Sequence, residues 1–124
     1  MAVQALIAVN GTGDADAAQG LDYLAARQSA SGGVGGGGPT SPVNANSTGL
    51  AGQAFLAGGR AAQARLANQF LGGLQYDCTF PVALRGGVAY DGTAFAAQRA
   101  AGPGATTVDQ DRRSTTQAVL SLSG

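Results

Sequence analysis

The chain has 124 residues, enough for one modest domain, and its seven basic and seven acidic residues give a net charge of zero. This balance disfavours charge-driven binding to nucleic acid or to a membrane surface, and no apolar run approaches the ~20 residues that cross a bilayer. Aromatic residues are only 6% of the chain and glycine supplies 21 residues, so we expect closely packed, alanine-rich helices joined by glycine-rich loops.

Apolar spacing and turn residues predict helices over 2–9, 15–28, 49–58, 61–75, 94–101 and 114–122. The first of these lacks the basic start of a secretory signal peptide and is interpreted as an amphipathic helix. Asp14 or Asp16 is expected to cap the second helix and Thr48 the third. Ser114 and Gln117 match a capping box ahead of the last helix.

The connecting segments differ in kind. Residues 29–47 are rich in glycine and proline and are predicted to form a long loop, whereas Gly58-Gly59-Arg60 predicts a tight turn between antiparallel helices. Residues 76–93 are interpreted as an insertion, and Gly102-Pro103-Gly104 is expected to end the helix before it. Within the insertion, only Val82 to Tyr90 leaves strand or loop open.

Two short themes recur along the chain. A Gln-Ala pair followed by two apolar residues begins at Gln4, Gln53 and Gln117, and a Leu-x-x-x-Gln pattern ends at Gln28 and Gln75. The copies lie 47 and 49 residues apart, except for the 64 residues between Gln53 and Gln117, where an insertion would lengthen the interval. A period of roughly 45–50 residues suits a repeat of two helices. We therefore predict a single all-α domain of helical hairpins over roughly 2–28, 49–75 and 94–122.

The segment from Gln28 to Gly35 resembles the Q-x-x-x-G-G-W-G "QW" repeat of the α/α-toroid superfamily, which includes terpene cyclases and protein prenyltransferase β-subunits. Gln75 with Gly86-Gly87-Val88 looks like a second, stretched copy. Actinobacterial secreted or wall-anchored proteins with prenyltransferase/squalene-oxidase-type repeats are most similar. The residues that carry the resemblance are Gln28, Gly32, Gly33, Gln53, Gln75, Gly86, Gly87 and Gln117.

The resemblance implies an arc of an α/α toroid with long glycine-rich loops and a secreted or cell-surface location. Val34 and Val88 replace the repeat's tryptophan. A closed toroid has about six hairpins, or roughly 250–300 residues at ~45 per repeat. With about two and a half hairpins, the chain is expected to be part of a larger polypeptide, a truncated reading frame or a protomer that completes its core with copies of itself.

The chemistry of the resembled enzymes is not expected here. Terpene cyclases use D-x-D-D, whereas Asp14-Ala15-Asp16 and Asp109-Gln110-Asp111 are only D-x-D and are interpreted as helix caps. The chain has no histidine and a single cysteine, Cys78, so the zinc set of the prenyltransferases and histidine-dependent nucleophilic catalysis are excluded. The sequence around Cys78 does not match the Cys–Gln thioester motif of the complement-like branch.

We accordingly predict no catalytic, cofactor-binding or metal-ligating residue and no cofactor. Cys78 is interpreted as a small, partly buried residue, the alternative being a thiol with a partner in another chain or in a missing part of this one. Arg112 and Arg113, beside Asp109 and Asp111, are interpreted as a solvated ion-pair cluster, with an anion site as the weaker alternative.

Two functions follow from the sequence. The first is a non-catalytic binding or scaffolding module that self-associates or joins a larger partner chain, with a small hydrophobic or cofactor-like ligand as a further expectation from cobalamin-carrying toroids. The alternative is a fragment of a terpene-cyclase-like or prenyltransferase-like enzyme. Neither function involves nucleic acid or a membrane span.

Overall fold

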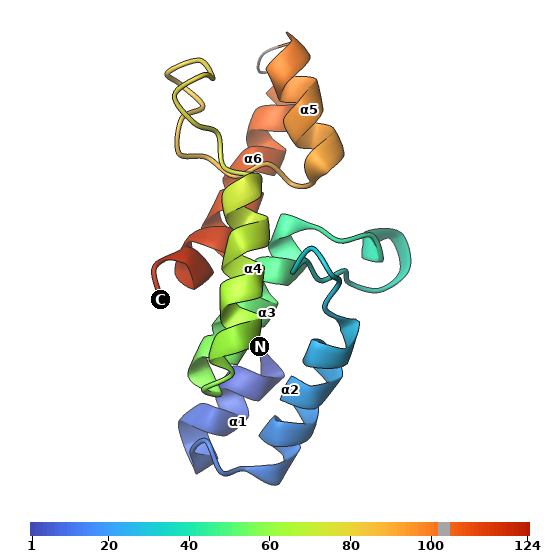
Figure 1. Cartoon of the computed structure of the whole chain (residues 1–124), viewed down its shortest axis with the longest axis vertical. Helices are drawn as coiled ribbons and strands as arrows, with labels where there is room; N and C mark the ends of the chain where they lie inside the picture. Colours follow the sequence, from blue (N-terminus) through green and yellow to red (C-terminus); the bar gives the residue numbers. More distant parts are fainter. Residues whose placement is uncertain (102–104) are drawn as a thin grey trace.

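A computed structural model describes residues 1–101 and 105–124 of the chain, with side chains described for 1–101 and 109–124 (Figure 1). Its α-helices are α1 (Ala2–Asn10), α2 (Ala15–Arg27), α3 (Ala45–Ala57), α4 (Ala61–Gly73), α5 (Gly92–Ala101) and α6 (Ala105–Leu122), and a 3₁₀ turn covers Gly38–Thr40. The described residues form no strand, only two isolated bridges, Gly35 with Val43 and Gln75 with Val88. The all-α prediction is confirmed, and the segment from Val82 to Tyr90 is a loop.

Four helices lie within two residues of their predicted ends, but α3 and α6 begin earlier than predicted. The cap of α3 is Asn44, whose side-chain oxygen accepts from the Ser47 amide at 2.9 Å, so Thr48 lies inside the helix. The predicted capping box is wrong as well. Ser114 lies inside α6, where its hydroxyl donates to the Gln110 carbonyl at 2.9 Å, a bond that accommodates serine within a helix.

The start of α2 and the turn after α3 agree with the sequence. Asp14 caps α2 by accepting from the Ala17 amide at 2.8 Å, and this bond, helped by the Asn10 side chain, lowers the pKa of Asp14. Gly58 and Gly59 form the tight turn into α4. Gly102-Pro103-Gly104, the predicted helix stop, lies outside the described residues.

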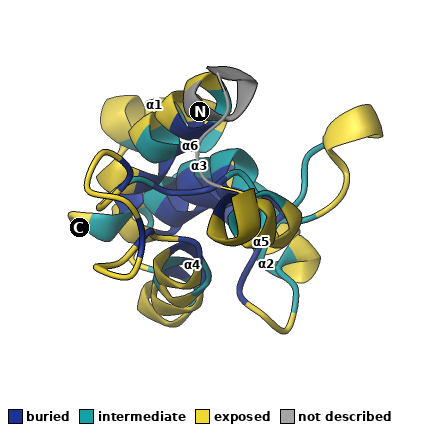
Figure 2. Ribbon diagram, turned by 90° about the horizontal axis from the view of Figure 1, so that it is seen from above, coloured by how far each residue is buried: buried dark blue, intermediate teal, exposed yellow. Residues whose placement is uncertain are grey.

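Helix α3 is the centre of the molecule, with α4 and α6 packed most closely against it and the α1–α2 hairpin at one end (Figure 1). Helices α3 and α6 run parallel, since Gly49 lies against Gln117 and Gly52 against Ser121. Buried residues gather along α3, whereas much of the outer surface of α1, α5 and the loops is exposed (Figure 2). Small residues permit this close approach and give the alanine-rich core its contact area.

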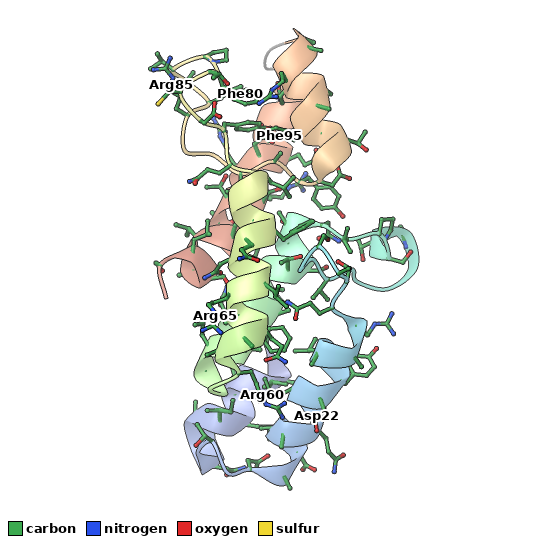
Figure 3. The ribbon with its side chains drawn as sticks, in the orientation of Figure 1. Asp22, Arg60, Arg65, Phe80, Arg85 and Phe95 are labelled. Carbon is green, nitrogen blue, oxygen red and sulfur yellow. The ribbon has the colours of Figure 1, made fainter. Side chains whose placement is uncertain are left out.

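Two apolar clusters flank α3. One, around Phe55, Leu21 and Val34, joins α2 and α3, and an ion pair of 2.6 Å between Arg60 and Asp22 crosses its surface (Figure 3). The other is centred on Tyr76, and the rings of Phe80 and Phe95 lie within 5.7 Å of it, centroid to centroid (Figure 3). Most of the few aromatic side chains therefore serve one end of the molecule.

Candidate functional site

The first glycine loop, residues 28–35, is held by its own hydrogen bonds. The Gln28 side-chain amide donates to the Gly32 carbonyl at 3.0 Å, and the Ser29 amide donates to the Gly33 carbonyl at 2.8 Å. The Gly32 amide donates back to the Ser29 carbonyl at 2.9 Å. The Val34 amide donates to the buried Thr48 hydroxyl on α3 at 2.8 Å, which ties the loop to the central helix.

The second glycine loop, residues 75–88, repeats this set bond for bond. Gln75 donates to the Gly86 carbonyl at 3.1 Å, the Tyr76 amide to the Gly87 carbonyl at 2.8 Å, and the Gly86 amide to the Tyr76 carbonyl at 2.8 Å. The Val88 amide donates to the Thr115 hydroxyl on α6 at 2.9 Å. The second loop thus stands on α6 as the first stands on α3.

The first glycine of the Gly-Gly pair in each loop adopts the same unusual backbone conformation. Gly32 has φ 88° and Gly86 has φ 84°, a region that residues with a Cβ rarely occupy. The second loop differs by an insertion, since Gln75 and Gly86 are eleven residues apart where Gln28 and Gly32 are four apart. Cys78 lies in this insertion and is exposed, so its interpretation as a partly buried residue is wrong.

The predicted equivalence of Gln53 and Gln117 is not the one these bonds define. If Thr48 is matched with Thr115, Gln117 corresponds to Leu50 and not to Gln53, a difference of three residues from the predicted equivalence. Gln53 instead touches Gln117 directly, its side-chain amide donating to the Gln117 carbonyl at 3.2 Å across the α3–α6 contact. The sequence of an alanine-rich helix aligns almost equally well when it is displaced by about one helical turn. The equivalence of the two threonines is instead defined by their hydrogen bonds to the glycine loops.

Helix α4 covers the first loop and nothing described covers the second. The Gln28 amide also donates to the Gln63 carbonyl of α4 at 2.9 Å, and the Leu66 carbonyl lies directly against Gly32. The Phe70 ring lies 2.8 Å from where a Cβ on Gly33 would stand. These contacts make the loop a seat for one face of a helix.

The surface of the second loop is open at Gly86, whereas at Gly87 the loop's own Leu84 carbonyl lies 3.0 Å from where a Cβ would stand. No described atom lies within 4 Å of where a Cβ on Gly86 would stand. Gly87 borders a hollow of about 230 Å³, called here the second-loop hollow, lined by Tyr76, Ala83, Leu84, Arg85, Gly87, Asp111, Arg112 and Thr115. A second hollow, of about 200 Å³, opens beside Tyr23, with a mostly apolar lining from α1, α2 and α3.

The four charged residues singled out near the chain's end do not form one cluster. Arg113 pairs with Asp109 at 2.9 Å on the exposed face of α6, one helical turn apart, and Arg112 is exposed. Asp111 points the other way and is only 6% exposed. The interpretation of Asp109 and Asp111 as helix caps is wrong, because α6 already begins at residue 105.

Asp111 is bound to residues far away in sequence. It accepts from the Tyr76 hydroxyl at 3.0 Å and, more weakly, from the Gln98 side-chain amide at 3.5 Å. Burial raises the pKa of Asp111, partly offset by these two bonds, and burial together with the Asp111 charge raises the pKa of Tyr76 above its ordinary value. No sequence pattern predicts this contact, because it depends on α6 lying beside the second loop.

The buried Asp111 is expected to give the protein a specific pH dependence. Its raised pKa means that stability from this group is full below the ordinary carboxyl value of 3.8 and is lost as pH rises through the folded-state pKa. Relative to an Asp111→Asn variant, the wild type should therefore lose stability as the pH rises from about 4 toward neutrality. Urea unfolding of both proteins across this range measures the difference. The opposite effects of Asp14 and of Asp77, whose pKa is lowered by hydrogen bonds from Thr79, are the same in both proteins and cancel. Parallel curves would contradict the expectation.

Within the described residues, no group of three or more cysteine, aspartate or glutamate side chains is placed to hold a metal ion. None of the described helices combines the length and apolar character that a membrane span requires. Comparisons with protein-family models, with curated proteins and with solved structures gave no match to this chain. The two glycine loops are therefore the main structural indication of function.

Proposed function

We propose that the chain is a non-catalytic scaffolding module of α/α-toroid-type repeats, which extends by seating a partner helix on its second glycine loop. The observation that carries the proposal is the duplicated bond set: Gln28, Gly32 and Thr48 in one loop, and Gln75, Gly86 and Thr115 in the other. A repeat protein buries its core by stacking such units, and an uncovered unit is a docking surface.

The parallel α3–α6 contact supports this proposal. In a row of hairpin repeats the inner helices lie side by side in one direction, each followed by an outer helix. Helices α3 and α4 fit this pattern, with α6 as the next inner helix. The position on α6 that corresponds to Gly52, the residue facing Ala67 of α4, is Val119, which is 49% exposed. An outer helix on α6 would cover this side chain as well as the second loop.

One observation favours the alternative, a fragment of a terpene-cyclase-like enzyme. Asp111 has a raised pKa, lines a hollow and lies close to the aromatic group of Tyr76, Phe80 and Phe95, features that suit a proton donor to an alkene. Incubation with linear polyprenyl alkenes, using Asp111→Asn as the control, discriminates between the functions. Cyclised product formed only by the wild type would favour the enzyme.

The scaffolding proposal is tested with a helix that copies α4. A hydrocarbon-stapled peptide of residues 60–74 is titrated into the ¹⁵N-labelled full chain, and amide shifts are followed by NMR. The peptide is expected to shift the signals of Gly86 and Gly87 but not those of Gly32 and Gly33, which the chain's own α4 covers. A peptide carrying Phe70→Ala is the matched control and should bind at least tenfold more weakly. Absence of any shift at Gly86 and Gly87 would contradict the proposal.

A further inference from the structure

From the pattern of covered and open surfaces we infer that the second glycine loop binds helix α2 of a second copy of this chain, so that copies join head to tail. The inference rests on the proposed function and adds the identity of the partner helix. It requires that α2 present the face with which α4 covers the first loop, and that this face be accessible.

Helix α2 matches α4 in sequence register and in burial. Leu24 aligns with Leu71 and Gln28 with Gln75, 47 positions further along the chain. The same register pairs Ala17 with Ala64, and both are buried against the central helices. The register then places Tyr23 where α4 has Phe70, so α2 carries an aromatic ring at the position that covers a glycine loop.

This face of α2 is exposed, and the Arg27 guanidinium of the same helix lies 5.3 Å from the Tyr23 ring centroid. Tyr23 is 60% exposed, whereas Phe70 is partly buried against Gly33 and the apolar cluster around Tyr76. The residues that the register matches with Gln63 and Leu66 are Asp16 and Gln19, and both are exposed. Carbonyl groups at these positions on α2 are thus available to meet Gln75 and Gly86 of another copy as those of α4 meet Gln28 and Gly32.

The second-loop hollow fits this helix in shape and in charge. It borders Gly87, the counterpart of Gly33, although the loop's own Leu84 carbonyl and Tyr76 ring, and not open space, lie nearest to where a Cβ on Gly87 would stand. Two arginines, Arg85 and Arg112, line it, and a tyrosine ring flanked by an aspartate is a favourable occupant for such a site through cation–π and ionic contact. Asp16 on the docked face of α2 is opposite in charge to these two arginines.

The apolar surface beside the loop extends the same interface. Leu120 is 59% exposed and follows Val119 on α6, next to where the docked helix would run. The partner's α1 would then continue the row of inner helices formed by α3 and α6. Because the α2 face and the loop are different surfaces, the contact is heterologous, and each copy keeps one free surface of each kind for the next copy.

Sedimentation velocity over a concentration series of the full chain tests the inference. The wild type is expected to associate reversibly, and Tyr23→Ala and Arg112→Glu should each weaken association at least tenfold. An equimolar mixture of these two variants should form one-to-one dimers, since one supplies an intact loop and the other an intact α2. Gln69→Ala, an exposed change on α4 outside both surfaces, is the matched control and should associate like the wild type. Thermal unfolding verifies that every variant is folded.

A wild type that stays monomeric at the highest concentrations overturns the inference, as does a Tyr23→Ala variant that associates normally or a mixture that fails to pair. The peptide titration separates this failure from that of the proposed function. If the α4 peptide shifts the amide signals of Gly86 and Gly87 while the chain remains monomeric, the second loop does bind a helix, but that helix belongs to a different protein.

Discussion

Gly32→Ala is expected to destabilise the protein by about 3 kcal/mol or more, measured as the free energy of unfolding in urea. Two penalties add at this position. The backbone φ of 88° costs a residue with a Cβ about 1–2 kcal/mol. A Cβ would also overlap the Leu66 carbonyl oxygen, so α4 would have to move away from the loop and release the Gln28 bond to Gln63.

Gly86→Ala is the matched control, because it shares the conformation without the overlap. Its φ is 84°, and no described atom lies within 4 Å of the added Cβ. The control should therefore lose only about 1–2 kcal/mol, the conformational part. The difference between the two variants measures how tightly α4 is seated on the first loop. Equal losses would show that the helix is not seated as described.

The two glycine loops could be predicted from the sequence, but the helix that covers one of them could not. Gln28 with Gly32, and Gln75 with Gly86, could be paired from the sequence because both segments resemble the Gln and Gly-Gly positions of the QW repeat. Which loop is covered could not be predicted, since it depends on α4 folding back over a loop 30 to 40 positions earlier. Local patterns carry no information on such contacts.

The helix boundaries separate in the same way. The starts of α2 and α4 could be predicted because Asp14 caps one and a glycine turn precedes the other. The starts of α3 and α6 could not, because the hydroxyl residues taken as caps lie inside these helices. The hydroxyls of Thr48 and Thr115 accept hydrogen bonds from the valine amides of the two glycine loops, and these bonds join residues 14 and 27 positions apart.

The burial of Asp111 is the largest departure from the sequence interpretation of the candidate site. A D-x-D pattern followed by two arginines reads as a solvated surface, and Asp109 with Arg113 fits that description. Asp111 lies on the opposite side of the helix, two positions on, and meets the Tyr76 hydroxyl 35 positions away. Only the packing of α6 against the second loop reveals that one carboxylate of the pair is buried.

Gly49→Ala is expected to destabilise the protein by about 2 kcal/mol, although alanine is the better helix former by about 1 kcal/mol. A Cβ at this position would overlap the Gln117 carbonyl, which is backbone and cannot turn aside. The parallel helices α3 and α6 would have to separate, weakening the Gln53 bond to Gln117 and loosening the Thr115 hydroxyl from the second loop.

Gly72→Ala gives the control that fixes the sign of this effect. Gly72 is also helical, near the end of α4, but a Cβ there meets no described atom within 4 Å. Alanine at this position should therefore stabilise the protein by up to about 1 kcal/mol. Opposite signs for the two changes, measured by urea unfolding, would locate the cost of Gly49→Ala in the helix contact and not in the helix itself. Because the second loop stands on α6, Gly49→Ala should also weaken binding of the α4 peptide, whereas Gly72→Ala should leave it unchanged.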